Sequence, residues 1–273
     1  MDLHKGKIHS IQSDIFEKRI VTASSDGVVR VFDNKAEAGS MPLLEINCEL
    51  QGSYGVCTKA VFIKDGELIA SSYFSGKLAL WKREAGTYTL AIVKDIFNGT
   101  IYDIDAVYKN EIIKIYCACS DGTLRIVDIA PGYTFSQEDV VAHRFGVTCV
   151  SSNSEYVVTG GLDNSVVLWR EKKEEMRFRD HSGFVRDVKI SRDNVFGLMS
   201  FASCSEDGIV NIYTKTQEEF KKQSIEIKEP VYSLSWSKTG FSLSVGFGSN
   251  GLKCFSPGSD GKFTEVDLTK CEN

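Results

Sequence analysis

Short apolar runs alternate with polar turns along this chain, and the same arrangement returns six times. In each copy a polar residue precedes Gly or Asn, and a stretch such as residues 28–33 (VVRVFD) or 165–170 (SVVLWR) follows. Apolar and polar positions with a period near two are typical of a strand with one buried face. Gly and Asn tolerate positive φ, so each copy is predicted to contain a tight hairpin turn. The six turn anchors are Gly27, Gly76, Gly122, Asn164, Gly208 and Asn250.

The spacing of these anchors predicts the fold. Neighbouring anchors are 42 to 49 residues apart, and a period in the forties is typical of a propeller blade of four strands. We therefore predict an all-β fold, a six-bladed β-propeller, as one domain spanning residues 1–273. The expected blades cover residues 1–50, 51–95, 96–142, 143–180, 181–228 and 229–273.

The number of predicted strands raises the question of how such a ring closes. The first blade is predicted to begin with its own innermost strand near residues 7–13, and the last to have all four of its strands, ending at residues 262–268, so no strand is left over as a latch. Either side-chain packing alone closes the ring, or it stays open and exposes two apolar flanks to which a partner adds strands. The residues expected to contact such a partner are Ile8, Ile11, Val29, Val31, Phe32, Phe241, Leu243 and Phe255, with packing against their own neighbouring blades as the alternative for each.

Composition and charge narrow the possible functions. Hydrophobic residues make up 42% and charged residues 25% of the 273 residues, with a net charge of −5. An acidic chain is a poor candidate for direct binding to nucleic acid or to anionic lipid. Basic residues gather at 170–179 and at Lys221 and Lys222, but glutamates interrupt the first run, so we expect a solvated rim there. No apolar run is long enough to span a membrane.

The eight cysteines show no CxxC spacing. Cys117, Cys119, Cys149 and Cys204 lie in apolar, strand-like sequence. We expect buried, reduced thiols, with disulfides or a zinc site as the alternative.

Candidate catalytic chemistry is sparse. Asp103 and Asp105 lie on one face of a predicted strand, and paired carboxylates can perform acid–base catalysis. The alternative is that they sit on an innermost strand and line a water-filled channel. His4 and His9 have no third ligand near them, so no metal site is expected. The sequence therefore predicts no catalytic residue, metal or cofactor, and a propeller hydrolase is the less favoured alternative.

The repeats resemble those of WD-repeat propellers. Trp81 and Trp169 hold the tryptophan position of that repeat. The resemblance implies a structural hydrogen-bond chain from a loop His through a strand Ser or Thr and the turn Asp to the Trp. The fourth blade has the complete set, whereas the first and fifth blades have Phe32 and Tyr213 in place of Trp. The implied members are His143, Thr159, Asp163 and Trp169; His4, Thr22 and Asp26; and His181, Ser203 and Asp207.

A closer resemblance covers nearly the whole chain. Residues 4–14 (HKGKIHSIQSD), 181–191 (HSGFVRDVKIS) and 231–236 (VYSLSW) are similar to the Sec13-type family, the small propellers of the COPII outer coat and of the Y-shaped nuclear pore complex. The resemblance implies a non-enzymatic scaffold in a hetero-oligomer. It also implies a larger helical-solenoid partner that donates a blade, no direct nucleic-acid contact, and only indirect contact with membrane. The implied locations are the cytoplasmic face of the endoplasmic reticulum, COPII vesicles and the nuclear pore. A sibling nucleoporin or a nutrient-signalling scaffold propeller is the alternative.

Overall fold

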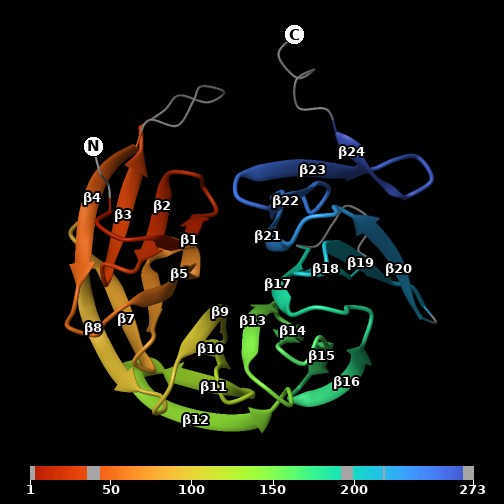
Figure 1. Cartoon of the computed structure of the whole chain (residues 1–273). Coiled ribbons are helices and arrows are strands. Elements are labelled where there is room, and N and C mark those ends of the chain that lie inside the picture. Colours follow the sequence, from red (N-terminus) through yellow and green to blue (C-terminus); the bar gives the residue numbers. More distant parts are fainter. Residues whose placement is uncertain (1–3, 36–43, 192–198, 218, 267–273) are drawn as a thin grey trace. The chain divides into compact units, whose positions relative to one another are not determined.

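Six four-stranded antiparallel sheets make up the fold, and each takes its strands from one continuous stretch of the chain. The computed structural model describes residues 4–35, 44–191, 199–217 and 219–266. The chain divides into two compact units, Met1–Val140 and Val141–Asn273, and each contains three of the sheets (Figure 1). The prediction of an all-β, six-bladed propeller with four-stranded blades is confirmed.

The first unit holds the sheets β1-β2-β3-β4, β5-β6-β7-β8 and β9-β10-β11-β12. Two short 3-10 turns, η1 (Lys64–Gly66) and η2 (Pro131–Tyr133), connect neighbouring strands. The strands are β1 (Ile8–Ser13), β2 (Arg19–Ser24), β3 (Val28–Asn34), β4 (Leu44–Gln51), β5 (Cys57–Ile63), β6 (Leu68–Tyr73), β7 (Lys77–Glu84), β8 (Thr87–Asp95), β9 (Ile101–Lys109), β10 (Ile112–Cys119), β11 (Thr123–Ala130) and β12 (Thr134–Val141).

The second unit holds the sheets β13-β14-β15-β16, β17-β18-β19-β20 and β21-β22-β23-β24. No helix in the part of the chain that the structure describes is long and apolar enough to cross a membrane. The strands are β13 (Val147–Ser152), β14 (Tyr156–Gly161), β15 (Val166–Arg170), β16 (Lys173–Phe178), β17 (Val185–Ile190), β18 (Ser200–Ser205), β19 (Ile209–Lys215), β20 (Phe220–Glu226), β21 (Val231–Trp236), β22 (Leu243–Phe247), β23 (Gly251–Pro257) and β24 (Phe263–Val266).

The hairpin turns form where the sequence predicts them, with one correction. The first five anchors all have positive φ, the conformation that Gly and Asn tolerate. At Gly76 any side chain is also excluded, since a Cβ would lie 2.0 Å from the carbonyl oxygen of Phe97. In the sixth repeat Gly248 has positive φ, and Asn250, the expected anchor, does not. The sixth turn lies between β22 and β23 as expected, but its positive-φ residue is Gly248 at the first turn position, because glycine accepts this conformation without strain.

Apolar clusters fill the spaces between neighbouring sheets of each unit. In the first unit, one cluster joins the β1–β4 and β5–β8 sheets, and a second joins β5–β8 to β9–β12. In the second unit, corresponding clusters join β13–β16 to β17–β20, and β17–β20 to β21–β24. Each sheet therefore buries its apolar residues on faces covered by other sheets, as expected for stacked blades.

Candidate binding surfaces

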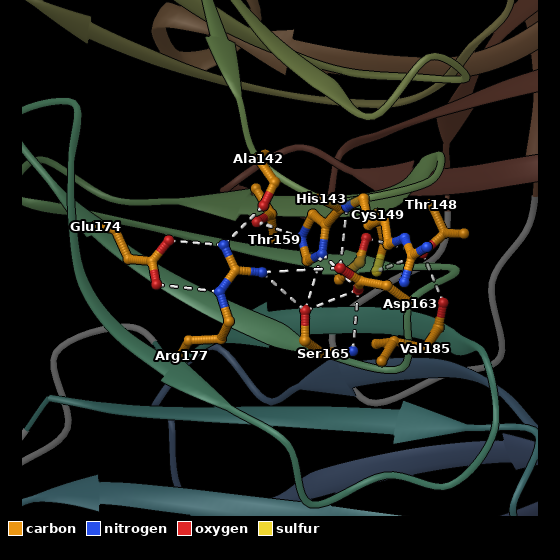
Figure 2. Close-up of polar contacts among 12 residues, drawn as sticks. Ala142, His143, Thr148, Cys149, Thr159, Asp163, Ser165, Glu174, Arg177 and Val185 are labelled. Carbon is orange, nitrogen blue, oxygen red and sulfur yellow. Dashed lines mark hydrogen bonds and ion pairs between the residues drawn. The ribbon is translucent and has the colours of Figure 1, made fainter.

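His143 lies at the centre of a buried hydrogen-bond chain in the fourth sheet (Figure 2). Trp169 Nε1 donates to Thr159 Oγ1 at 3.0 Å, and Thr159 Oγ1 lies 2.9 Å from His143 Nε2. His143 Nδ1 lies 2.8 Å from Asp163 Oδ1. A neutral imidazole satisfies the whole chain: Thr159 donates to Nε2, and Nδ1–H donates to the carboxylate. The structure thus brings together all four residues that the WD-repeat resemblance implied.

Asp163 gathers further donors that the sequence reading did not anticipate. Its carboxylate accepts hydrogen bonds from the backbone N–H groups of Arg144 and Ser165 and from the Ser165 hydroxyl. Arg177 donates to Ser165 Oγ and forms a paired contact with Glu174. Burial alone would raise the pKa of Asp163, but the hydrogen bonds from His143 and Ser165 outweigh it and hold the pKa well below its usual range. Asp163 is therefore an anion at neutral pH.

The fifth sheet has the same hydrogen-bond chain but lacks the tryptophan at its end. His181 Nδ1 lies 3.0 Å from Asp207 Oδ2, and His181 Nε2 lies 2.8 Å from Ser203 Oγ. Tyr213 takes the Trp position, and its hydroxyl donates instead to Asp180. Burial lowers the pKa of His181, although the carboxylate of Asp207 opposes this effect. The imidazole is therefore neutral at physiological pH.

In the first sheet the hydrogen-bond chain ends at the threonine. His4 lies 3.0 Å from Asp26 Oδ2 and 2.7 Å from Thr22 Oγ1. Phe32 is buried in the Trp position and has no polar hydrogen to donate.

Two arginines that the sequence reading missed bind the turn aspartates. Arg30 Nη1 donates to Asp26 at 3.0 Å, and Arg125 donates to both carboxylate oxygens of Asp121. In both repeats Arg stands four residues after the turn Asp. The shared pattern, SDGVVR and SDGTLR, could therefore have predicted this pairing from the sequence. In the third sheet Arg125 thus binds the turn Asp as His does in the fourth.

Side chains on β1, β13 and β17 accept hydrogen bonds from the backbone of the next sheet. Gln12 Oε1 accepts from Phe62 N–H at 2.7 Å, and Ser10 Oγ accepts from Ala60 N–H at 3.2 Å. In the second unit, Ser151 Oγ accepts from Ile190 N–H at 3.0 Å, and Asp187 Oδ2 accepts from Leu234 N–H at 2.9 Å. These bonds, which we name inter-sheet latches, fix one blade against the next.

The predicted acid–base pair is part of the same packing. Asp103 is only 6% exposed, and its carboxylate lies 3.0 Å from Lys59 Nζ on the neighbouring sheet. The expectation that Asp103 lines a water-filled channel is therefore wrong, because β5 covers this carboxylate with a cation. Asp105 accepts a hydrogen bond from the N–H of Ala106. A carboxylate engaged by a lysine and covered by protein is a poor general base for an external substrate.

The predicted partner-contact residues fall into two groups. Val29 and Val31 belong to the apolar cluster that joins the β1–β4 and β5–β8 sheets, and Leu243 and Phe255 to the one that joins β17–β20 and β21–β24. Phe32 is buried. The remaining three side chains are exposed on the molecular surface: Ile8 at 53%, Ile11 at 67% and Phe241 at 42%. A partner role for the eight residues stays a prediction, and the exposed three are the ones that a partner reaches without displacing other side chains.

The sheet β21–β24 has one face that no other sheet of its unit covers. Leu243 and Phe255 point toward the neighbouring β17–β20 sheet, so the strand register places Ser233, Ser235 and Leu252 on the opposite face. Ser233 and Ser235 occupy the positions on β21 that correspond to Asp187 and Lys189 on β17. Both hydroxyls are exposed, and neither has a hydrogen-bond partner among the residues that the structure describes.

The cysteines expected to be buried are buried. Cys117, Cys119, Cys149 and Cys204 all lie in the cores, and the described cysteines are free thiols. Burial raises the pKa of Cys119 to about 11, and it raises the pKa values of Cys117 and Cys204 well above their usual range. Such thiols are protonated at neutral pH and are weak nucleophiles. Within the described ranges, no group of three or more His, Cys, Asp or Glu side chains is arranged to hold a metal ion.

Comparison with protein families finds a match to WD repeats in three stretches of this chain. The family described as "WD domain, G-beta repeat" matches residues 1–33, 134–170 and 172–214. These three stretches contain the His–Ser/Thr–Asp chains of the first, fourth and fifth sheets.

Several known proteins are similar along nearly the whole chain. The Protein SEC13 homolog of Drosophila melanogaster is 25% identical over 295 residues, which cover 97% of this chain and 81% of the relative. The Protein transport protein sec13 of Emericella nidulans is 25% identical over 300 residues, covering 96% and 95% of the two chains. The Protein transport protein SEC13 of Yarrowia lipolytica is 27% identical over 297 residues, covering 98% and 97%.

Proposed function

We propose that this chain, a WD-repeat β-propeller that resembles Sec13-type proteins along nearly its whole length, is a non-enzymatic scaffold subunit of a membrane coat or nuclear pore assembly. The near-complete alignment with protein-transport proteins carries the proposal, because the alignment spans all six blades and is not limited to a single repeat. The propeller binds a larger partner with a helical solenoid and stiffens it. It works at the endoplasmic reticulum and on transport vesicles, or at the nuclear pore.

The partner donates a blade that packs on the uncovered face of β21–β24. Ser10, Gln12, Ser151 and Asp187 show how a blade holds the next one, with a side-chain oxygen that accepts a backbone N–H. Strand addition of this kind gains affinity from main-chain hydrogen bonds and selectivity from the side chains that pack around them. Ser233 and Ser235 would accept the N–H groups of the donated strand in the same way.

The first sheet presents an exposed apolar surface of its own to a partner. Ile11 pairs with Thr22, which places both on the face opposite to the one packed against the β5–β8 sheet. Ile8 and Ile11 are exposed β-branched side chains, and a partner strand that covers them buries apolar surface. An interface of this kind is expected to be large and apolar, on the order of 2,000 Å² or more.

Capture of the partner by blocked variants tests the proposal. The tagged chain is expressed in its own cells as wild type, as Ser233→Arg/Ser235→Arg, and as the control Ser53→Arg, which changes an exposed loop serine. We expect the wild type and the control to retain a coat or pore solenoid protein identified by mass spectrometry, and the double variant to lose it with unchanged Tm. Equal capture by all three would disprove the docking face, and the absence of any such solenoid protein would disprove the function.

A further inference from the structure

A pocket of about 580 Å³ lies in the second unit, at the loop end of the fourth and fifth sheets. Three segments form it: the connection between β12 and β13, the turn between β14 and β15, and the end of β16 with the connection to β17. His143, Asp163 and Arg177, which Figure 2 labels, are among its lining residues. We name this the basic pocket. Its other lining residues are Val141, Ala142, Arg144, Phe145, Leu162, Asn164, Arg179 and Phe184.

The charge of the basic pocket is opposite to that of the chain. Three arginines and one carboxylate line it, although the protein carries a net charge of −5. Asp163 is already satisfied by His143, Ser165 and a backbone N–H, and Arg177 is held by Glu174. The guanidinium groups of Arg144 and Arg179 are exposed, and no ion pair within 4 Å holds either of them in the described part of the chain, although Arg179 is near enough to the Glu174 carboxylate to lower its pKa. An anionic group placed between the loops would find two unpaired cations.

Apolar side chains flank these cations. Val141 is 81% exposed, Phe145 53% and Phe184 44%, and all three line the same pocket. The Arg144 guanidinium lies over the Phe145 ring, 5.4 Å from its centre. Single exposed apolar residues are ordinary, whereas a group of them around a concave basic site marks a binding surface.

We propose that the basic pocket binds an acidic peptide segment of a partner protein, in which an Asp or Glu lies next to a bulky apolar residue. The planar guanidinium of arginine matches a carboxylate with two parallel hydrogen bonds. The neighbouring apolar side chain packs on Phe145 and Phe184. Two free arginines in a small pocket suit one or two carboxylates, whereas a nucleic acid requires an extended basic surface, which an acidic chain does not favour. This site is separate from the β21–β24 face and does not depend on a donated blade.

Selection of short random peptides on the purified full chain tests this proposal. We expect the selected peptides to be enriched in Asp or Glu beside an aromatic or aliphatic residue, and their affinity to fall as salt is raised. The Arg144→Gln/Arg179→Gln variant should weaken the selected peptides by about tenfold or more, because each lost charge-assisted hydrogen bond is worth more than a neutral one. Phe145→Ser should weaken them as well.

The matched control is Arg170→Gln/Arg186→Gln, which removes two other exposed arginines of the same unit and changes the net charge equally. It should leave the affinity within about twofold of wild type, because neither arginine lines the pocket and exposed ion pairs contribute little. Thermal unfolding of each variant separates lost binding from lost folding. Selected peptides without acidic residues, or equal weakening by both double variants, would overturn the proposal.

Discussion

Arg19 Nη1 donates to Tyr88 Oη at 2.6 Å, and this bond joins β2 of the first sheet to β8, the outermost strand of the second. The same guanidinium donates to Asp14 at 3.2 Å and to the carbonyl oxygen of Gly66 at 3.0 Å. All three side chains in this group are buried. The contact therefore acts as an outer counterpart of the inter-sheet latches on the innermost strands.

Loss of the Arg19 guanidinium should destabilise the first unit more than loss of the Tyr88 hydroxyl. Arg19→Met leaves the buried Asp14 without its cation, and we expect a loss of about 3 kcal/mol. Tyr88→Phe removes one hydroxyl, and we expect about 1 kcal/mol. Urea unfolding of the single and double variants measures both losses. Since the residues are in contact, the double variant should lose less than the two singles together; strict additivity would contradict the coupling.

The ion pair between Lys59 and Asp103 gives the second prediction. Asp103→Asn leaves the partly buried ammonium of Lys59 without its carboxylate, and we expect a destabilisation of about 2 kcal/mol. Lys59→Met should partly restore stability in the Asp103→Asn background, because it removes the uncompensated charge. Thermal unfolding checks the order of the variants. If the double variant were the least stable of the three, the proposed pairing would be wrong.

The polar chains of the first and fourth sheets form a natural matched pair. Thr159→Val removes the acceptor of Trp169 Nε1 and the partner of His143 Nε2, so two buried groups lose a bond. Thr22→Val removes the partner of His4 Nε2 and a long 3.5 Å contact with the carbonyl oxygen of Arg30, but no ring N–H loses its acceptor, because Phe32 donates nothing. We expect losses of about 3 kcal/mol for Thr159→Val and about 1 kcal/mol for Thr22→Val, measured as shifts of Tm. Equal shifts would show that Trp169 contributes nothing to the chain.

The sequence predicts more of the fold than of its contacts. Turn residues such as Gly27 and Gly208 require positive φ, so their spacing predicted the hairpins and, through them, the sheets. The members of the polar chains were predictable because they recur at similar positions in three repeats. The sequence could not predict which sheet covers Val29 and Val31. The alternation of apolar and polar residues shows that a strand has two faces, but it does not show which neighbouring sheet covers each face. Asp103 likewise needed the position of β5 to show its lysine partner.

The last prediction concerns the dependence of stability on pH. Burial lowers the pKa of His181 below the value of about 6.5 that an unfolded chain has, so the unfolded state takes up a proton first as the pH falls. The contribution of a neutral His181 to stability is thus complete above about pH 6.5 and is lost as the pH falls from there toward the folded pKa. The pKa values of Asp26, Asp163 and Asp207 are lowered, so their contribution is complete above about pH 4 and is lost in stronger acid.

The wild-type Tm should therefore fall in two stages as the pH decreases, first below about pH 6.5 and again below about pH 4. His181→Asn should remove much of the first stage and keep the second. The control is His9→Asn, which replaces an exposed ring bonded to Ser25 Oγ and should follow the wild-type profile. Differential scanning fluorimetry across this range measures all three proteins. A first stage that persists undiminished in His181→Asn would show that another group titrates there, and the neutral buried imidazole would not be the cause.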